Sequence, residues 1–250
     1  MIDTIDRFSN RVANYIKYRP DYPREIIRLL RAECGLTRDA IIADVGCGTG
    51  ISSRMFLENG NRVFGVEPNA AMRDAAVKLL GVFPWFIAVD GTAENTTLQT
   101  GSIDIVIAAQ AFHWFDGEGA GVEFRRILKP GGRIVLIWNE RRLDATPFLI
   151  EYEAFLLRFA RDYASVRHDR FDAATVEAML GTGMQTAAFE NTQEFDFEGL
   201  MGRMLSASYM PSESDAVFPA MIDELRLLFA KHAENGKIKL LYDTRIYYSQ

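Results

Sequence analysis

The sequence has few cysteines, no long apolar run and no dense stretch of basic residues. Only Cys34 and Cys47 are present, and Cys47 stands inside a glycine-rich segment where a disulfide would obstruct a ligand site. We therefore expect reduced thiols. The residues from Met1 to Asp6 lack the basic region and apolar stretch of a signal peptide, and no apolar run reaches membrane-spanning length. These features predict a cytoplasmic protein without a membrane partner.

The charge balance is acidic. Lysine and arginine number 28 against 34 aspartate and glutamate residues, which gives a formal net charge of -6. No run of basic residues forms a stripe for a phosphate backbone, so we expect no nucleic-acid partner. The 250 residues, 48% hydrophobic and 25% charged, fit a single globular α/β domain with an insertion. The composition leaves the oligomeric state open.

Short apolar runs alternate with helix-like stretches between residues 41 and 140, a pattern that predicts βαβ units and a parallel sheet. Asn69 is a candidate cap for a helix that runs toward Leu80, with Gly81 as its stop. Another helix is expected over residues 51–58. The expected strands cover residues 41–45, 62–67, 85–90, 103–109 and 133–139, the last entered through a turn at 129–132.

The flanking segments predict mainly helices. A helical arm is expected from Asp6 to Leu30, interrupted at residues 19–23 by two prolines. After Glu140, aromatic residues at helical spacing indicate an inserted helical cap. The remaining expected elements are helices over 198–208 and about 214–235, the latter capped by Gly236, and a closing strand over 239–249. We expect one domain over 1–250, with an arm (1–35), a cofactor-binding core (41–140), a helical cap or substrate region (141–185 and 198–235) and C-terminal strands (186–197 and 237–250).

The segment Asp44-Val45-Gly46-Cys47-Gly48-Thr49-Gly50 lies between the first expected strand and helix. A glycine-rich turn there lets a ligand approach the backbone and the positive end of the helix. A dinucleotide fingerprint has the spacing G-x-G-x-x-G and would need glycine where Ile51 stands; the spacing here is G-x-G-x-G. Asp44 would repel a pyrophosphate but suits a ligand with an ammonium group. S-adenosylmethionine has such a group and no phosphate.

The pattern Asp44-x-Gly46-x-Gly48-x-Gly50 resembles the first motif of class I S-adenosylmethionine-dependent methyltransferases. The resemblance implies a Rossmann-like three-layer α/β sandwich, with a mostly parallel seven-stranded sheet, helices on both faces and a helical cap insertion. It also implies that Glu67 accepts hydrogen bonds from both ribose hydroxyls. Asp90 would accept a hydrogen bond from the exocyclic amine of the adenine, with Gly91, Thr92 and Ala93 beside that ring and Glu94 as an additional contact.

The segment from Ala109 to Phe115 resembles the part of this family that passes beneath the methionine moiety and the transferring methyl group. Together with Tyr15 and Tyr18-Arg19-Pro20, the sequence around Gln110 resembles the small-molecule branch that includes trans-aconitate methyltransferase-like enzymes. Arg19 would then pair with the methionine carboxylate, although a surface arginine is an equal alternative. The cofactor-binding residues expected are Tyr18, Arg19, Asp44, Gly46, Gly48, Gly50, Glu67, Met72, Asp90, Gly91, Thr92, Ala93 and Gln110; no metal site is expected.

His113 is the candidate catalytic residue, either as a general base or as a hydrogen-bond partner of the substrate. A packing histidine is an equal alternative. A carboxylate acceptor is already ionised at neutral pH and needs no base, whereas a phenol or an amine does. In that second case His113→Ala would lower turnover and leave cofactor affinity intact. Phe112 and Trp114 could shield the sulfonium, but we expect them in the core and assign Trp114 no catalytic role. The remaining pocket candidates have a helical spacing that more commonly means core packing: Met201, Met204, Tyr209 and Met210.

The sequence thus predicts an enzyme that transfers a methyl group from S-adenosylmethionine to a small-molecule acceptor, at a carboxylate or hydroxyl oxygen, with S-adenosylhomocysteine as product. A non-catalytic module that binds the same cofactor is one alternative. An NAD-dependent oxidoreductase is another, but the glycine spacing and Asp44 argue against it.

Overall fold

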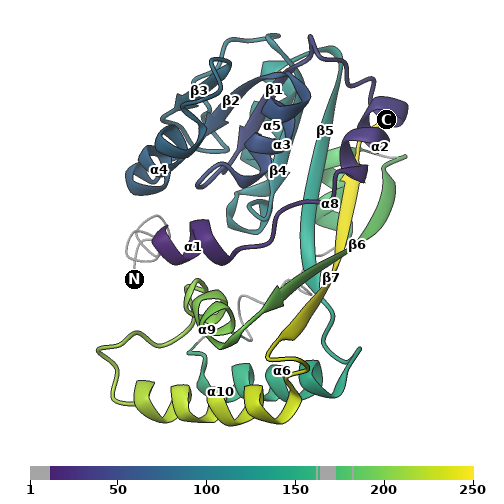
Figure 1. Ribbon diagram of the computed structural model, residues 1–250. Coiled ribbons are helices and arrows are strands. Elements are labelled where there is room, and N and C mark those ends of the chain that lie inside the picture. The colour runs from purple at the N-terminus through teal and green to yellow at the C-terminus, as the bar shows by residue number, and fades with distance from the viewer. Residues whose placement is uncertain (1–11, 162, 164–172, 182) are drawn as a thin grey trace.

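The structure is a computed structural model that describes residues 12–161, 163, 173–181 and 183–250. Its sheet has seven strands in the order β3-β2-β1-β4-β5-β7-β6 (Figure 1). The strands are β1 (Ile41–Val45), β2 (Arg62–Val66), β3 (Phe86–Val89), β4 (Ile103–Ala109), β5 (Leu128–Arg141), β6 (Gln185–Phe195) and β7 (Ile238–Tyr248). Strand β7 is antiparallel to both of its neighbours, and β1 to β5 pair in parallel. The predicted fold class is confirmed.

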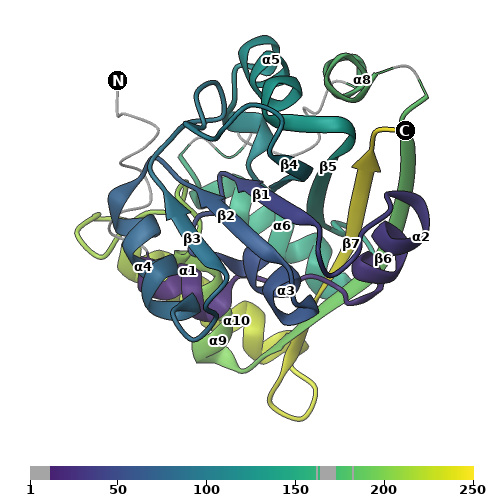
Figure 2. The ribbon, with the colours of Figure 1, turned by 90° about the horizontal axis from the view of Figure 1, so that it is seen from above.

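Helices cover both faces of the sheet because successive strand residues point to opposite sides. On one face Ala43 and Val45 of β1 pack with α5 (Gly117–Ile127) and α8 (Ala173–Leu180). On the other face Ile42 packs in a cluster with residues of three helices (Figure 2). Those helices are α2 (Glu25–Glu33), α3 (Ile51–Asn59) and α4 (Ala70–Leu80). The result is a three-layer sandwich.

A third apolar cluster forms the cap at one end of the sheet. Its helices are α6 (Pro147–Phe159), α9 (Phe197–Leu205) and α10 (Phe218–His232). They pack around Leu240 and Tyr242, at the end of β7 that lies away from the cofactor-binding core in Figure 1. Helix α1 (Val12–Tyr18) lies beside α9 and is separated from α2 by Pro20 and Pro23. The expected helical residues before 12 and from 164 to 172 lie outside the described residues.

Four elements differ from the expectation, the first being helix α5, which was not predicted. Helix α8 lies on the sheet rather than with the cap, because its apolar residues, Val176 among them, are buried against α5. Gly236 does not cap α10, whose C-cap is Ala233; it stands in the turn that leads into β7. Strand β5 begins at Leu128 instead of residue 133, and the expected turn is a bulge within that strand. None of the described helices has the length and apolar character that a membrane crossing needs.

Candidate functional site

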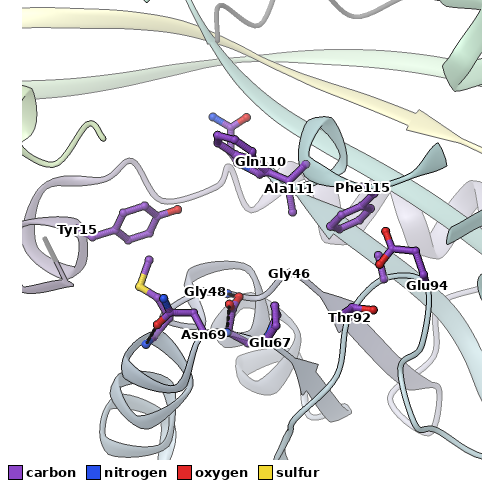
Figure 3. Close-up of a pocket in the computed structure, with 14 residues that line it drawn as sticks. Tyr15, Gly46, Gly48, Glu67, Asn69, Thr92, Glu94, Gln110, Ala111 and Phe115 are labelled. Atoms are coloured by element: carbon purple, nitrogen blue, oxygen red, sulfur yellow. Dashed lines mark hydrogen bonds between the residues drawn. The ribbon is translucent and has the colours of Figure 1, made fainter. Parts of the chain in front are cut away.

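A cleft of about 250 Å³ opens where β1, β2, β3 and β4 end (Figure 3). Strand β1 has β2 on one side and β4 on the other, so successive strands are added to one side of β1 up to β3 and to its other side from β4 onward. Open parallel sheets bind ligands at such a crevice. The cleft is lined by Tyr15, Gly46, Gly48, Glu67, Pro68, Asn69, Met72, Thr92, Ala93, Glu94, Gln110, Ala111, Trp114 and Phe115. We call it the cofactor pocket.

The glycine loop after β1 forms the floor of the cofactor pocket. Gly46 has φ +70°, and a Cβ atom there would stand 2.6 Å from the Cβ of Ala111, which follows β4. Gly48 has φ +56° and open space where a side chain would be, so its backbone faces the pocket. Gly50 was expected in the same site but instead packs toward Leu80 of α4. Two of the three glycines therefore contact the pocket.

Glu67 connects the glycine loop to the start of α4. Its Oε2 accepts a hydrogen bond from the backbone N–H of Gly48 at 2.9 Å, and its Oε1 accepts one from the N–H of Asn69 at 2.9 Å. The Asn69 side chain in turn caps α4 by accepting from the N–H of Met72. Burial raises the pKa of Glu67. A carboxylate has about four acceptor positions, so both oxygens can still accept bonds from a ligand with two hydroxyls.

Asp44 lies behind the pocket wall. It is fully buried, and its Oδ2 accepts hydrogen bonds of 2.6 Å from the hydroxyls of Ser52 and Ser53, in the first turn of α3. Its Oδ1 has no partner, and burial raises its pKa to about 6. We expected this carboxylate to contact the ligand directly. The structure instead places it where it holds α3 against the glycine loop.

Two further expected residues stand outside the pocket lining at the end of β3. Asp90 is 74% exposed and forms an ion pair with Arg73 at 3.1 Å. The same guanidinium donates to the backbone oxygen of Glu67, so Arg73 holds Asp90 at the outer surface of the sheet edge. Gly91 packs closely against the backbone of Thr96. The polar side chains that do line this side are those of Thr92 and Glu94.

The arm reaches the opposite side of the pocket. Tyr15 of α1 lines the pocket, and the guanidinium of Arg19 lies 4.9 Å from its ring centroid. Tyr18 lies against Gly202 of α9 rather than in the pocket lining. Side chains of β6 hold the arm: Gln193 donates to the backbone oxygen of Tyr18 at 3.0 Å. Neither Tyr18 nor Arg19 reaches the pocket wall itself.

The segment after β4 forms the remaining wall. Gln110 has φ +54°, an unusual backbone conformation for this residue, and its Nε2 donates to the backbone oxygen of Asn139 at 3.3 Å. Its Oε1 is buried without a partner. Trp114 lines the pocket, whereas we expected it in the core; Phe112 is in the core as expected. His113 is exposed, lies outside the lining and contacts the ring of Trp114 at 4.8 Å between centroids.

Seven expected residues line the pocket: Gly46, Gly48, Glu67, Met72, Thr92, Ala93 and Gln110. The lining residues not predicted as cofactor-binding are Tyr15, Pro68, Asn69, Glu94, Ala111, Trp114 and Phe115. Most of these residues are next to a motif residue in the sequence, and this proximity could have predicted that they line the pocket. Tyr15 stands four residues before Arg19, the spacing that puts two side chains on one helix face.

The charge of the pocket wall distinguishes between ligand classes. Glu67 and Glu94 are acidic, and the described residues that line the pocket include no lysine, arginine or histidine. Such a wall attracts a cation and repels a pyrophosphate. The residues therefore fit S-adenosylmethionine, which carries a sulfonium and an ammonium group, better than a dinucleotide.

Comparison with known proteins identifies the family. Residues 43–136 match the methyltransferase domain family. The chain is 33% identical to an uncharacterised methyltransferase of Mycobacterium tuberculosis strain H37Rv, over 95% of this chain and 92% of that protein. It is 30% identical to an uncharacterised methyltransferase-like protein of Schizosaccharomyces pombe, over 100% of this chain and 98% of that protein. The chain belongs to the S-adenosylmethionine-dependent methyltransferases.

Solved structures show the same fold. A protein of Anaeromyxobacter dehalogenans, described as a candidate type II methyltransferase, superposes with a TM-score of 0.69 at 22% identity and covers 93% of this chain and 98% of its own. A candidate methyltransferase from an antibiotic biosynthesis pathway of Anabaena variabilis has a TM-score of 0.60 at 24% identity, over 94% of this chain and 98% of its own.

Proposed function

We propose that this methyltransferase transfers a methyl group from S-adenosylmethionine to an oxygen of a small-molecule acceptor, with a carboxylate as the favoured group. The observation that supports S-adenosylmethionine as the methyl donor is the acidic pocket wall, with Glu67 at the end of β2. The sequence around Tyr15, Arg19 and Gln110 supports the acceptor class, through its resemblance to trans-aconitate methyltransferase-like enzymes. The formal net charge of -6 argues against a nucleic-acid acceptor.

The donor would lie across the pocket from its Glu94 side to its Tyr15 side, which are opposite each other in Figure 3. Glu67 would accept the ribose hydroxyls between them, and Thr92, Ala93 and Glu94 would contact the adenine. The methionine moiety would then approach Gln110, whose unpartnered Oε1 is an acceptor suited to an ammonium group. In this arrangement Asp44 and Asp90 act on the shape of the site rather than on the ligand.

The transfer itself is an in-line displacement. The donor supplies an electrophilic methyl carbon: an acceptor oxygen forms a bond to it while the carbon–sulfur bond breaks, and that electron pair stays on the sulfur. A carboxylate acceptor enters as an anion and leaves as an ester, so no proton moves. The chain's contribution is to align the two reactants and exclude water. Trp114 and Phe115 are the large apolar side chains of the wall that would exclude it.

A substitution at His113 distinguishes a carboxylate acceptor, which needs no general base, from an acceptor that has to be deprotonated. The side chain is exposed and stands outside the pocket lining. With a carboxylate acceptor we expect His113→Ala to keep both turnover and the affinity for S-adenosylhomocysteine. A loss of turnover at unchanged cofactor affinity would instead indicate an acceptor that has to be deprotonated, such as a phenol.

The proposal is tested with S-adenosylmethionine labelled in its methyl group and a metabolite panel of carboxylic acids, phenols and amines. We expect label in the product of at least one carboxylic acid, in a form that alkaline hydrolysis releases as methanol, because an ester is cleaved by base. Label only in phenols or amines would contradict the carboxylate. Binding of S-adenosylhomocysteine without transfer to any member would favour a non-catalytic cofactor-binding module.

A further inference from the structure

We propose that Arg19 and Arg203 together form a binding site for a carboxylate group beside the cofactor pocket, and that this carboxylate belongs to the methyl acceptor. The assignment to the acceptor rests on the proposed function. Arg203 has no role in the cofactor site described above, and its side chain comes from the cap helix α9. The two arginines would thus join the arm and the cap around one anion.

The two guanidinium groups meet at Ser206, at the end of α9. Nη2 of Arg19 donates to the backbone oxygen of Ser206 at 3.1 Å, and Nη1 of Arg203 lies 3.5 Å from its hydroxyl oxygen. The Nε of Arg203 contacts the hydroxyl oxygen of Tyr242 at 3.3 Å. Helices α1 and α9 lie side by side here (Figure 1), which brings together residues far apart in the sequence.

Neither arginine has a counter-ion among the residues that the structure describes. Other partly buried arginines do: Arg141 forms an ion pair with Glu153, and Arg142 forms one with Asp243 at 2.7 Å. The Nε of Arg19 is buried and has no acceptor. Burial lowers the pKa of Arg19, and the charge of Arg203 lowers it further. Burial acts in the same direction on Arg203, but the hydroxyls of Tyr242 and Tyr209 outweigh it and raise the pKa of this group. Guanidinium groups stay protonated at neutral pH, so two like charges lie close together with no carboxylate of the described residues beside them.

An anion between the two groups would compensate both charges. A guanidinium presents its N–H groups as a planar fork that matches the two oxygens of a carboxylate. Arg19 also stacks on the ring of Tyr15, which lines the cofactor pocket, so the bound carboxylate would lie next to the methionine side of that pocket. An acceptor held there would carry one carboxylate for binding and present another group to the methyl donor.

The cofactor also has a carboxylate, on its methionine part, and the sequence predicts that Arg19 binds it. The experiment therefore has to distinguish the carboxylate of the cofactor from that of the acceptor. Two ligands distinguish the sources: S-adenosylhomocysteine has that carboxylate, and 5′-methylthioadenosine lacks the whole amino-acid part. Calorimetry would measure the affinity of both for the wild type, Arg19→Gln, Arg203→Gln and Arg203→Lys. Arg158→Gln, on the exposed face of α6, is the control. Thermal unfolding shows that each variant is folded.

The acceptor source is then probed with succinate, glutarate and citrate in the presence of saturating S-adenosylhomocysteine, each compared with its methyl ester. We expect at least one acid to bind the wild type, and Arg203→Gln to weaken that binding about tenfold or more, because the variant loses a hydrogen bond between two charged groups. Arg203→Lys should be intermediate. Arg203→Gln should leave S-adenosylhomocysteine affinity within about twofold.

Two results would overturn the inference. If Arg203→Gln weakens S-adenosylhomocysteine but not 5′-methylthioadenosine, the carboxylate belongs to the cofactor and the acceptor assignment is wrong. If no acid binds better than its ester and both arginine variants bind S-adenosylhomocysteine normally, there is no anion site. Either result leaves methyl transfer by the wild type to be measured separately, so the proposed function stands or fails on its own assay.

Discussion

Glu67 is the residue on which the geometry of the cofactor pocket depends most directly. Its two carboxylate oxygens bind the N–H groups of Gly48 and Asn69, which belong to the glycine loop and to the cap of α4. Only an acceptor at both positions satisfies those two donors. A glutamine side chain has one oxygen and one NH₂ group, so it would place a donor against a backbone donor.

We expect Glu67→Gln to weaken S-adenosylhomocysteine binding by about 10- to 100-fold, because a hydrogen bond to a charged group contributes roughly 1.5–3 kcal/mol. Isothermal titration calorimetry measures the change. Glu58→Gln is the matched control, since Glu58 pairs with Arg54 on the exposed side of α3. Affinity within twofold of the wild type, in a variant that melts normally, would remove Glu67 from the ligand site.

Asp44 gives the stability of the protein a definite pH dependence. Burial raises its pKa from 3.8 to about 6 in the folded chain. Between about pH 4 and pH 6 the folded state therefore holds a proton that the unfolded state has lost, so this carboxyl makes the fold less stable as the pH rises through that window. The size is roughly 2–3 kcal/mol at neutral pH.

The test compares urea unfolding of the wild type and Asp44→Asn at pH 4.5, 5.5, 6.5 and 7.5. We expect the free energy of unfolding of the wild type to fall relative to that of the variant as the pH rises, because asparagine does not titrate. Titrating groups that do not interact with Asp44 contribute equally to both proteins and cancel in the difference. Glu67, whose pKa the charge of Asp44 raises, adds to the difference in the same direction. A difference that is constant over this range would show that Asp44 has an ordinary pKa in the folded state.

At the scale of elements, the contact between α1 and α9 sets where the arm lies. A Cβ atom built on Gly202 would stand 2.0 Å from the ring of Tyr18, so only a glycine allows the two helices to approach this closely. Tyr15 is on the same helix as Tyr18 and lines the pocket. The spacing of the two helices therefore affects the cofactor pocket.

We expect Gly202→Ala to lower the free energy of unfolding by about 1–3 kcal/mol through overpacking, although alanine favours a helix by roughly 1 kcal/mol. It should also weaken S-adenosylhomocysteine binding. In a background with Tyr18→Ala the same change should cost less, because the ring is gone. Gly121→Ala in α5, where the nearest atom is the end of the flexible Arg125 side chain, is the control. Equal effects of Gly202→Ala with and without Tyr18 would contradict this account.

At the scale of the whole molecule, the acidic pocket predicts which ligand stabilises the fold. A ligand at 100 times its dissociation constant adds about 2.7 kcal/mol of stability, which for a chain of this size raises the Tm by roughly 5–10 °C. We expect S-adenosylhomocysteine to give a shift of this size and NAD to give none. A shift with NAD alone would contradict the methyl donor assigned here.

The sequence by itself determined much of the fold. The alternation of apolar runs and helical stretches located β1 to β4 and the helices α3 and α4, because each of these elements carries its own local pattern. Helix α5, which follows β4, was not predicted. Asn69 and Gly81 correctly marked the two ends of α4. The spacing from Gly46 to Gly50, with Asp44 before it, indicated S-adenosylmethionine rather than a dinucleotide. This could be predicted because the loop depends on the backbone conformation of a few consecutive residues.

Only the tertiary structure decided which of those residues face the pocket. Asp44 lies near the end of β1 and Asp90 directly after β3, so both were expected to face the pocket. Instead Asp44 accepts hydrogen bonds from the hydroxyls of Ser52 and Ser53. Asp90 forms an ion pair with Arg73. Arg203 and Arg19 are 184 positions apart in the sequence but both contact Ser206 where α1 and α9 pack together. A local sequence pattern cannot predict such a contact. The physical reason is that side-chain direction depends on partners from other elements, and these are fixed only when the elements pack.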